Sequence, residues 1–183
     1  MKKLLIILMV TLFIAMTVKG QNLFFIGEHS YPCTETFTLQ SNSDAWYIND
    51  LDVVFTRDKN VALFAVSSKT EDLLILGKLM IYLDDGEVIT LTDRGNYDYV
   101  DHIASAVYFL PNEELNKLKK NNINTIRYTL KDVNGLWSPL EGNYSASDRG
   151  SSRIDFPAIV SEYYENFISL IDDSVVETGA VNP

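Results

Sequence analysis

The sequence contains few of the residues on which cross-links and metal centres depend. Among its 183 residues there are one cysteine and two histidines. A single thiol excludes an intramolecular disulfide framework, and two imidazoles leave no histidine-rich metal site. With five prolines and nine glycines, the chain also lacks the composition of collagen-like or disordered proteins. Its 46% hydrophobic and 22% charged residues are those of an ordinary globular domain.

Positive charge is scarce as well. Fifteen lysines and arginines face 25 aspartates and glutamates, which gives a formal net charge of −10. A protein that binds nucleic acid needs a basic surface to displace counterions from phosphates, and the composition offers none. We therefore predict no nucleic-acid partner.

The N-terminus has the pattern of a secretory signal peptide. Two lysines precede an apolar run over residues 4–18, which is broken only by two threonines. The run is shorter than the roughly 20 residues that a membrane-spanning helix needs. Val18 and Gly20 match the small-residue rule for cleavage, so that Gln21 becomes the first residue. We predict a cleaved leader over 1–20, an exported protein in the periplasm or outside the cell, and no membrane span afterwards; an uncleaved anchor is the alternative.

Cleavage would remove three of the lysines and change the formal net charge from −10 to −13. We expect residues 21–178 to form a single α+β domain and residues 179–183 to form a frayed tail. The only thiol, Cys33, has no neighbouring histidine or basic residue that would lower its pKa, and we expect it to be inert.

Strand signals dominate the first two thirds of the chain. Apolar and polar residues alternate, or apolar residues run without interruption, between polar turns. Gly77 falls within one apolar run and is a candidate bulge or bend. The predicted strands are 35–40, 51–56, 61–67, 73–83, 88–91, 101–110 and 123–131.

The sequence Asp84-Asp85-Gly86-Glu87 predicts a tight hairpin turn. A two-residue loop would place Asp84 directly opposite Glu87, which is an unfavourable pair of like charges. A type I turn followed by Gly86 as a left-handed bulge avoids this pairing. We favour the bulged turn.

Two helices complete the predicted fold. The first covers 112–120, with glutamates in its first turn and lysines near its end, as the helix dipole favours. The second begins at Pro157, and its apolar residues recur at spacings of three and four. Hairpin connections without regular β-α alternation indicate an α+β fold. We predict an antiparallel, curved sheet of about six or seven strands with the C-terminal amphipathic helix packed on it.

Residues 132–155 lack any apolar periodicity, and a stretch of this length is typically functional or flexible. It contains Trp137, Tyr144, Arg149 and Arg153. The two aromatic residues either anchor the loop in the core or face a partner. If they face outward, they could stack on a sugar ring or anchor a protein contact, and the two arginines could bind a carboxylate. We take these four residues as the candidate ligand or partner contact.

One part of the chain resembles known sequences. The block from Ile81 to Leu91, together with 100–104, 113–115 and 123–130, resembles segments of uncharacterised exported proteins of Bacteroidota-type bacteria. The Gly-Gln-Asn sequence at the predicted cleavage site is similar to export junctions in those organisms. The resemblance covers roughly residues 70–131 and implies export, but it assigns no activity and no functional residue.

Enzyme motifs are missing from the sequence. It contains no Gly-x-Ser-x-Gly elbow, no P-loop and no dinucleotide-binding glycine motif. His102 follows Asp101, an arrangement that can orient an imidazole, but no matching nucleophile is evident. The acidic stretch 93–101 supplies oxygen ligands that suit Ca²⁺, although its spacing is not that of the twelve-residue calcium loop. We predict no catalytic residue, cofactor or metal ligand.

These observations favour an exported, non-catalytic domain that binds a protein or a glycan. Two alternatives stay open. The first is a small exported hydrolase that acts through carboxylates, of which the chain has many. The second is an acidic inhibitor or immunity-type protein that meets a basic target. The sequence does not indicate the oligomeric state.

Overall fold

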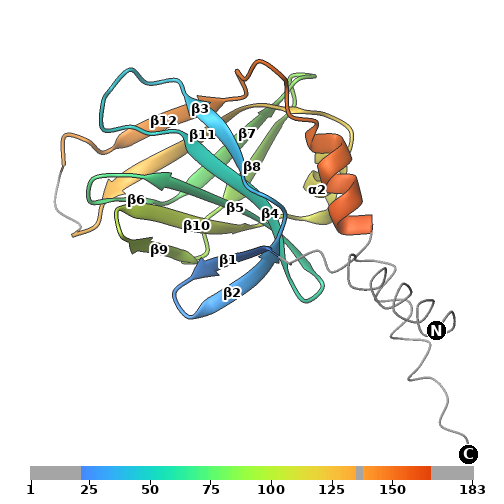
Figure 1. The fold of residues 1–183 in the computed structure, drawn as a ribbon, viewed down its shortest axis with the longest axis horizontal. Helices are drawn as coiled ribbons and strands as arrows, with labels where there is room; N and C mark the ends of the chain where they lie inside the picture. The colour runs from blue at the N-terminus through green and yellow to red at the C-terminus, as the bar shows by residue number, and fades with distance from the viewer. Residues whose placement is uncertain (1–21, 135–137, 166–183) are drawn as a thin grey trace, which may run out of the picture.

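The computed structural model describes residues 22–134 and 138–165. These residues form a strongly curled antiparallel sheet with one helix, α2 (Asn112–Leu118), and a second helix over residues 156–165 (Figure 1). The α+β class and the curved sheet are therefore confirmed. No helix in the described part of the chain is long and apolar enough to cross a membrane.

The sheet contains more strands than the six or seven that we predicted. Its main path runs β8-β7-β11-β12-β3-β4-β5-β10-β9, while β1 pairs with β2, β2 with β4, and β6 with β11. The twelve strands of the described residues are β1 (Asn22–Ile26), β2 (His29–Cys33), β3 (Phe37–Ser41), β4 (Leu51–Asp58), β5 (Val61–Lys69), β6 (Leu73–Ile75), β7 (Lys78–Leu83), β8 (Val88–Thr92), β9 (Tyr97–Val100), β10 (Ile103–Phe109), β11 (Ile123–Asp132) and β12 (Gly142–Ser147).

The additional strands have two origins. β2, β9 and β12 contain polar or irregular sequences, and β1, in which four of the five residues are apolar, forms a hairpin with β2 that we did not predict. The run 73–83, which we predicted as one strand, is divided into β6 and β7 because Gly77 adopts a positive φ of 80°. The predicted bend at Gly77 is therefore confirmed.

The hairpin between β7 and β8 has the bulged turn that we favoured. The Gly86 N–H donates to the Leu83 carbonyl at 3.1 Å, and the Leu83 N–H donates to the Glu87 carbonyl at 2.9 Å. Gly86 has a φ of 89°, which is the left-handed conformation that the bulge requires. The bulged turn thus keeps the carboxylates of Asp84 and Glu87 from lying directly opposite each other.

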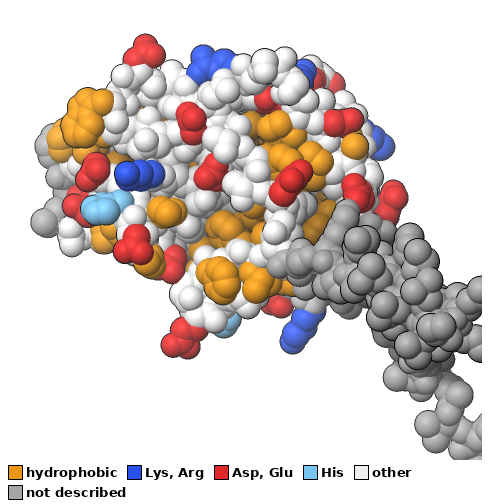
Figure 2. Space-filling view, in the orientation of Figure 1, with side chains coloured by type: hydrophobic (Ala, Val, Ile, Leu, Met, Phe, Trp, Pro, Cys, Tyr) orange, Lys and Arg blue, Asp and Glu red, His pale blue; other side chains and the backbone are white. Residues whose placement is uncertain are grey.

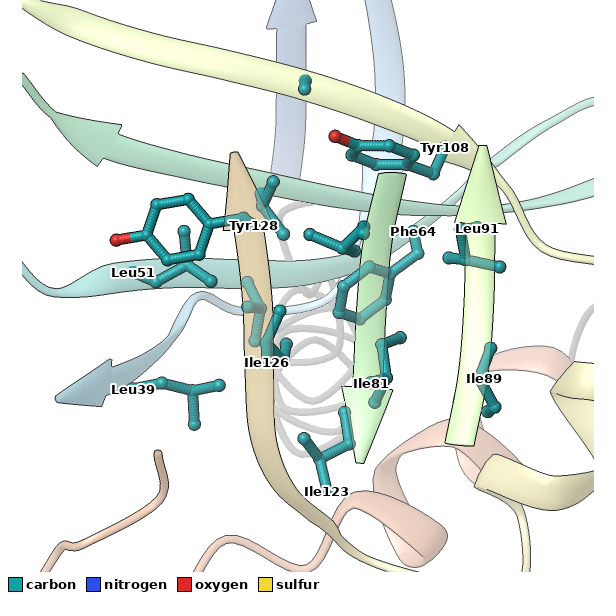
Figure 3. Close-up of a cluster of buried hydrophobic side chains, with 14 of the residues drawn as sticks. Leu39, Leu51, Phe64, Ile81, Ile89, Leu91, Tyr108, Ile123, Ile126 and Tyr128 are labelled. Atoms are coloured by element: carbon teal, nitrogen blue, oxygen red, sulfur yellow. The ribbon is translucent and has the colours of Figure 1, made fainter. Parts of the chain in front are cut away.

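The inner face of the curled sheet forms the main hydrophobic core. Side chains from both ends of the sheet meet there, including Phe64, Ile81, Tyr108, Ile126 and Tyr128 (Figure 3). In β11 the inward residues are buried and Arg127 and Lys131 are exposed, as its alternation predicts.

The helix over 156–165 closes this core from one side (Figure 1). Phe156, Val160 and Tyr164 are buried, and the Tyr164 hydroxyl donates to the carbonyls of Thr56 and Leu63, each at 2.9 Å. Burial raises the pKa of this hydroxyl far above its ordinary value of 10.0. The predicted packing of the helix on the sheet is confirmed for these residues. The rest of its predicted apolar stripe, Phe167, Ile168 and Ile171, lies outside the described residues.

A second, smaller core lies on the outer face of β4, β5 and β10. The β1–β2 hairpin covers this face and contributes Phe24, Ile26 and Tyr31. On the far side of the hairpin, Leu23 and Phe25 are exposed, and Figure 2 shows hydrophobic side chains over this part of the molecule. Aspartates and glutamates are spread across the same view rather than gathered in one patch (Figure 2).

Candidate functional site

The segment 132–155, which we expected to lack regular structure, contains strand β12. This strand pairs with β11 from Thr125↔Ser147 to Leu130↔Gly142 and also contacts β3. The expectation of a long irregular loop was therefore wrong. β12 has the sequence Gly-Asn-Tyr-Ser-Ala-Ser, in which only Ala146 is fully buried, so no apolar alternation reveals it.

Tyr144 is an anchor rather than an outward-facing group. Its ring packs beside the main core at 6.4 Å from the Tyr128 ring, and its hydroxyl donates to the Leu140 carbonyl at 2.7 Å. Burial, and secondarily the neighbouring Tyr47, raises the pKa of the hydroxyl. Trp137 lies outside the described residues.

The two predicted arginines are engaged within the protein. The Arg149 guanidinium donates to the Ser41 carbonyl at 2.5 Å. Arg153 Nη2 donates to Asp84 Oδ1 at 2.5 Å, and its Nε lies 3.9 Å from Asp148 Oδ2. The structure thus brings Arg153 to the β7–β8 turn and Arg149 to the end of β3. A carboxylate partner would have to compete with these contacts.

The acidic stretch also makes internal contacts. Asp93 accepts hydrogen bonds from the N–H groups of Gly95 and Gly77, and Asp98 accepts one from Gly27 at the tip of the β1–β2 hairpin. The described residues contain no group of three or more acidic, histidine or cysteine side chains that could hold a metal ion. Asp101 and His102 both have positive φ and form the two-residue turn between β9 and β10.

A different surface has the character of a binding site. The outer face of β7, β11 and β12 contains an open groove with a volume of about 480 Å³. Of the described residues that line it, three are basic and none is acidic. The lining residues are Leu76, Gly77, Lys78, Met80, Arg127, Thr129, Lys131 and Asn143. We refer to this surface as the basic groove.

A change of register creates the basic groove. Arg127 pairs with Met80 of β7, whereas Leu130 pairs with Ile75 of β6. Between these two pairs, two residues of β11 are matched by four residues, 76–79, on the neighbouring segment, which therefore has two extra residues where β6 ends and β7 begins. The sheet is hollowed at this point because a regular pleated ladder is interrupted there.

The three cations of the basic groove are free to bind a ligand. Lys78, Arg127 and Lys131 are exposed, and none of their side chains forms an ion pair or hydrogen bond with another described residue. The nearest acidic group with a defined contact to the lining is Asp93, which accepts the Gly77 N–H at 3.3 Å. The hydrogen-bond donors of these three side chains are therefore available to a ligand, although the protein as a whole has a net negative charge.

Two uncharged polar groups lie between these cations. The Thr129 hydroxyl donates to Asn143 Oδ1 at 3.0 Å, across the β11–β12 ladder. This bond fixes the orientation of the Asn143 amide, whose nitrogen can then donate to a ligand. Hydrogen-bonding groups and positive charge therefore line the same groove.

Sequence reasoning predicted a strand over 123–131 but did not identify Arg127, Thr129 and Lys131 as a site. The available signal was their alternation on a strand in a chain with few cations. Lys78 carried no such signal, since only the pairing of β7 with β11 brings it beside these residues. Comparisons with protein-family models, curated proteins and solved structures found no match.

Trp46 is a second exposed feature that the sequence analysis did not single out. Its side chain is 84% exposed on the loop between β3 and β4. The loop is ordered by a hydrogen bond from the Ser41 N–H to Asp50 and by a turn from Ala45 to Ile48. An indole held in solvent by a fixed loop is a candidate contact for a partner.

Proposed function

We propose that this protein is an exported, non-catalytic binding domain that holds an anionic ligand in the basic groove. The observation that carries the proposal is that Lys78, Arg127 and Lys131, three cations that pair with no other described residue, line one hollow of the sheet. Only twelve basic residues remain once the predicted leader is removed, so a quarter of them line this groove.

Charge complementarity explains why the occupant is anionic. The rest of the surface carries an excess of carboxylates and repels anions at long range. Among the described lining residues of the groove there are three cations and no carboxylates, so a carboxylate of a ligand is attracted there. An Arg guanidinium can bind it with two parallel hydrogen bonds, and a lysine adds a point charge.

The lining supports binding rather than catalysis. Its described residues include no histidine, cysteine, aspartate or glutamate, which are the usual groups for acid–base or nucleophilic chemistry. Its polar groups are threonine, asparagine, lysine and arginine, which orient and neutralise a ligand.

A charge-matched pair of variants tests the site. The groove variant Lys78→Gln/Arg127→Gln/Lys131→Gln and the control Lys59→Gln/Lys69→Gln/Lys120→Gln remove the same charge, and the control residues are exposed and outside the groove. Binding to polygalacturonate, heparin and poly-L-glutamate is measured by calorimetry at low and high salt. We expect the groove variant to lose at least about tenfold in affinity for each ligand that the wild type binds, and the control to lose less than about twofold.

Two outcomes would overturn the proposal. Either the wild type binds none of the three polyanions at low salt, or the control variant loses as much affinity as the groove variant.

Export has its own test, which is the intact mass of protein recovered from outside the cytoplasm. We expect Gln21 as the first residue; a chain that retains Met1 in the membrane fraction would contradict export.

A further inference from the structure

The basic groove has a repeating pattern along β11. Arg127, Thr129 and Lys131 occupy alternate positions and therefore face the same side of the strand. At about 3.3 Å per residue, neighbouring side chains in this row are roughly 7 Å apart, and the two cations are roughly 13 Å apart. The row thus presents a cation, a hydroxyl and a second cation in line.

The neighbouring strands extend the pattern sideways. Asn143 lies opposite Thr129 on β12, and Lys78 lies two residues from Met80, the partner of Arg127 on β7. Uncharged hydrogen-bonding groups therefore alternate with cations along β11, and Lys78 and Asn143 flank this row on the two neighbouring strands. A ligand that fits this surface carries charges separated by neutral hydroxyl groups, rather than a dense row of charges.

The lining also argues against a polypeptide. Protein interfaces depend on a few large apolar or aromatic anchors that fill pockets. None of the described residues that line the basic groove is aromatic, and the apolar side chains among them are Leu76 and Met80. Threonine and asparagine instead match the hydroxyl groups of a sugar, which both donate and accept hydrogen bonds.

We propose that the occupant of the basic groove is an acidic polysaccharide whose carboxylates are spaced along the chain, as in a polyuronate, and that it lies along β11. This inference rests on the proposed function, because it names the class of anion that the groove selects. The Arg127 guanidinium and the Lys131 ammonium bind successive or alternate carboxylates, while Thr129 and Asn143 contact the hydroxyl groups between them.

A ligand panel separates this inference from the proposed function. Polygalacturonate is compared with its fully methyl-esterified form, with heparin and with poly-L-glutamate, all at one ionic strength. We expect polygalacturonate to bind at least about tenfold more tightly than each of the other three. Equal binding of all polyanions, lost in the groove variant, would refute the polysaccharide and leave the proposed function standing. Absence of binding to every polyanion would refute both.

A single hydroxyl provides a sharper test. Thr129→Val keeps the shape of the side chain and all three cations, but it removes the hydroxyl that faces the groove. We expect it to weaken polygalacturonate binding about threefold to tenfold and to leave the weaker binding of poly-L-glutamate unchanged. Thr90→Val is the matched control, since Thr90 lies opposite Met80 on β8 and outside the lining. An equal loss for both ligands, or no loss for either, would contradict the inference.

Discussion

The two halves of the curled sheet differ in what covers their outer faces. Over β4, β5 and β10, the outer residues Val54, Ala65 and Val107 are buried beneath the β1–β2 hairpin. Over β7, β11 and β12, the outer residues are polar or cationic and line the basic groove. We call these the covered half and the bare half. Both halves share one inner core.

The difference is already present in the strand sequences. β5 is buried at five consecutive positions, from Ala62 to Val66, because both of its faces meet other side chains. β11 alternates between buried and exposed residues because only its inner face is packed. A strand that is free on one face can carry functional side chains without loss of the core, and this is where the cations of the groove lie. The following predictions test this comparison.

The largest effect is expected in the inner core. The Phe156 side chain is fully buried, with its ring centroid 5.9 Å from that of Phe37 and 6.1 Å from that of Phe55. Phe156→Ala should lower the free energy of unfolding by about 3–5 kcal/mol, because it removes apolar burial and leaves a cavity. Urea titration measures the change, with the exposed Trp46→Ala as a control that should shift stability by less than about 0.5 kcal/mol. Similar midpoints for Phe156→Ala and wild type would show that the C-terminal helix is not part of the core.

An equivalent substitution on each outer face tests the comparison directly. Ala65→Asp places an unpaired carboxylate under the β1–β2 hairpin and should cost about 2–4 kcal/mol. Thr129→Asp places the same group on the bare half beside three cations and should cost less than about 1 kcal/mol, while it abolishes anion binding. Equal destabilisation in urea titrations would mean that the two faces do not differ as described.

Most of the framework could be predicted from the sequence because burial leaves a regular pattern. β4, β5, β10 and β11 were predicted from their apolar residues, and the bulged turn at Gly86 was predicted from charge repulsion and backbone geometry. β12 was missed because its residues are held by backbone pairing on both sides, and Gly, Asn and Ser carry no signal for that. β1 and β2 were missed as well, although four of the five residues of β1 are apolar; their side chains pack on an outer face that no sequence pattern identifies as covered.

The candidate site was less accessible to sequence reasoning. The arginines that we selected, Arg149 and Arg153, are far from their internal partners in sequence, and only folding brings Arg153 to Asp84. Conversely, Lys78 and Arg127 come together through the pairing of β7 with β11, which alternation alone does not reveal. Tertiary contacts determine whether a basic side chain is already paired within the protein. They therefore determine which basic residues can bind a ligand.

No element of the described residues covers the outer face of the bare half as the β1–β2 hairpin covers the other half. The turns of the bare half should therefore be important for its stability. Gly86→Val forces a β-branched residue into a φ of 89°, although a Cβ there would meet no atom within 4 Å. The cost is therefore purely conformational, and we expect a loss of about 1–2 kcal/mol in the free energy of unfolding. Gly86→Asn should lose clearly less, because asparagine tolerates left-handed backbone. Equal midpoints in urea for all three proteins would contradict the bulged turn.

The smallest effect concerns the ion pair that ties the β7–β8 turn to the segment after β12. The hydrogen bond from Arg153, with a lesser one from Asn124, lowers the pKa of the Asp84 carboxyl below its ordinary value of 3.8, although partial burial opposes this shift. A pKa that is lower in the folded state means that the ionised carboxylate stabilises the fold above that ordinary value. This contribution is lost as the pH falls through the folded-state pKa.

Arg153→Gln should therefore lower the free energy of unfolding by less than about 1 kcal/mol at pH 7, because both side chains of the pair are substantially exposed. The difference from wild type should shrink as the pH falls below about 4, where Asp84 becomes protonated in the unfolded chain. Arg149→Gln is the matched control, since its guanidinium bonds a backbone carbonyl and its effect should not depend on pH in this range. Thermal unfolding from pH 3 to pH 7 measures both variants. A difference between Arg153→Gln and wild type that stays constant over this range would show that the Asp84 ion pair does not stabilise the bare half.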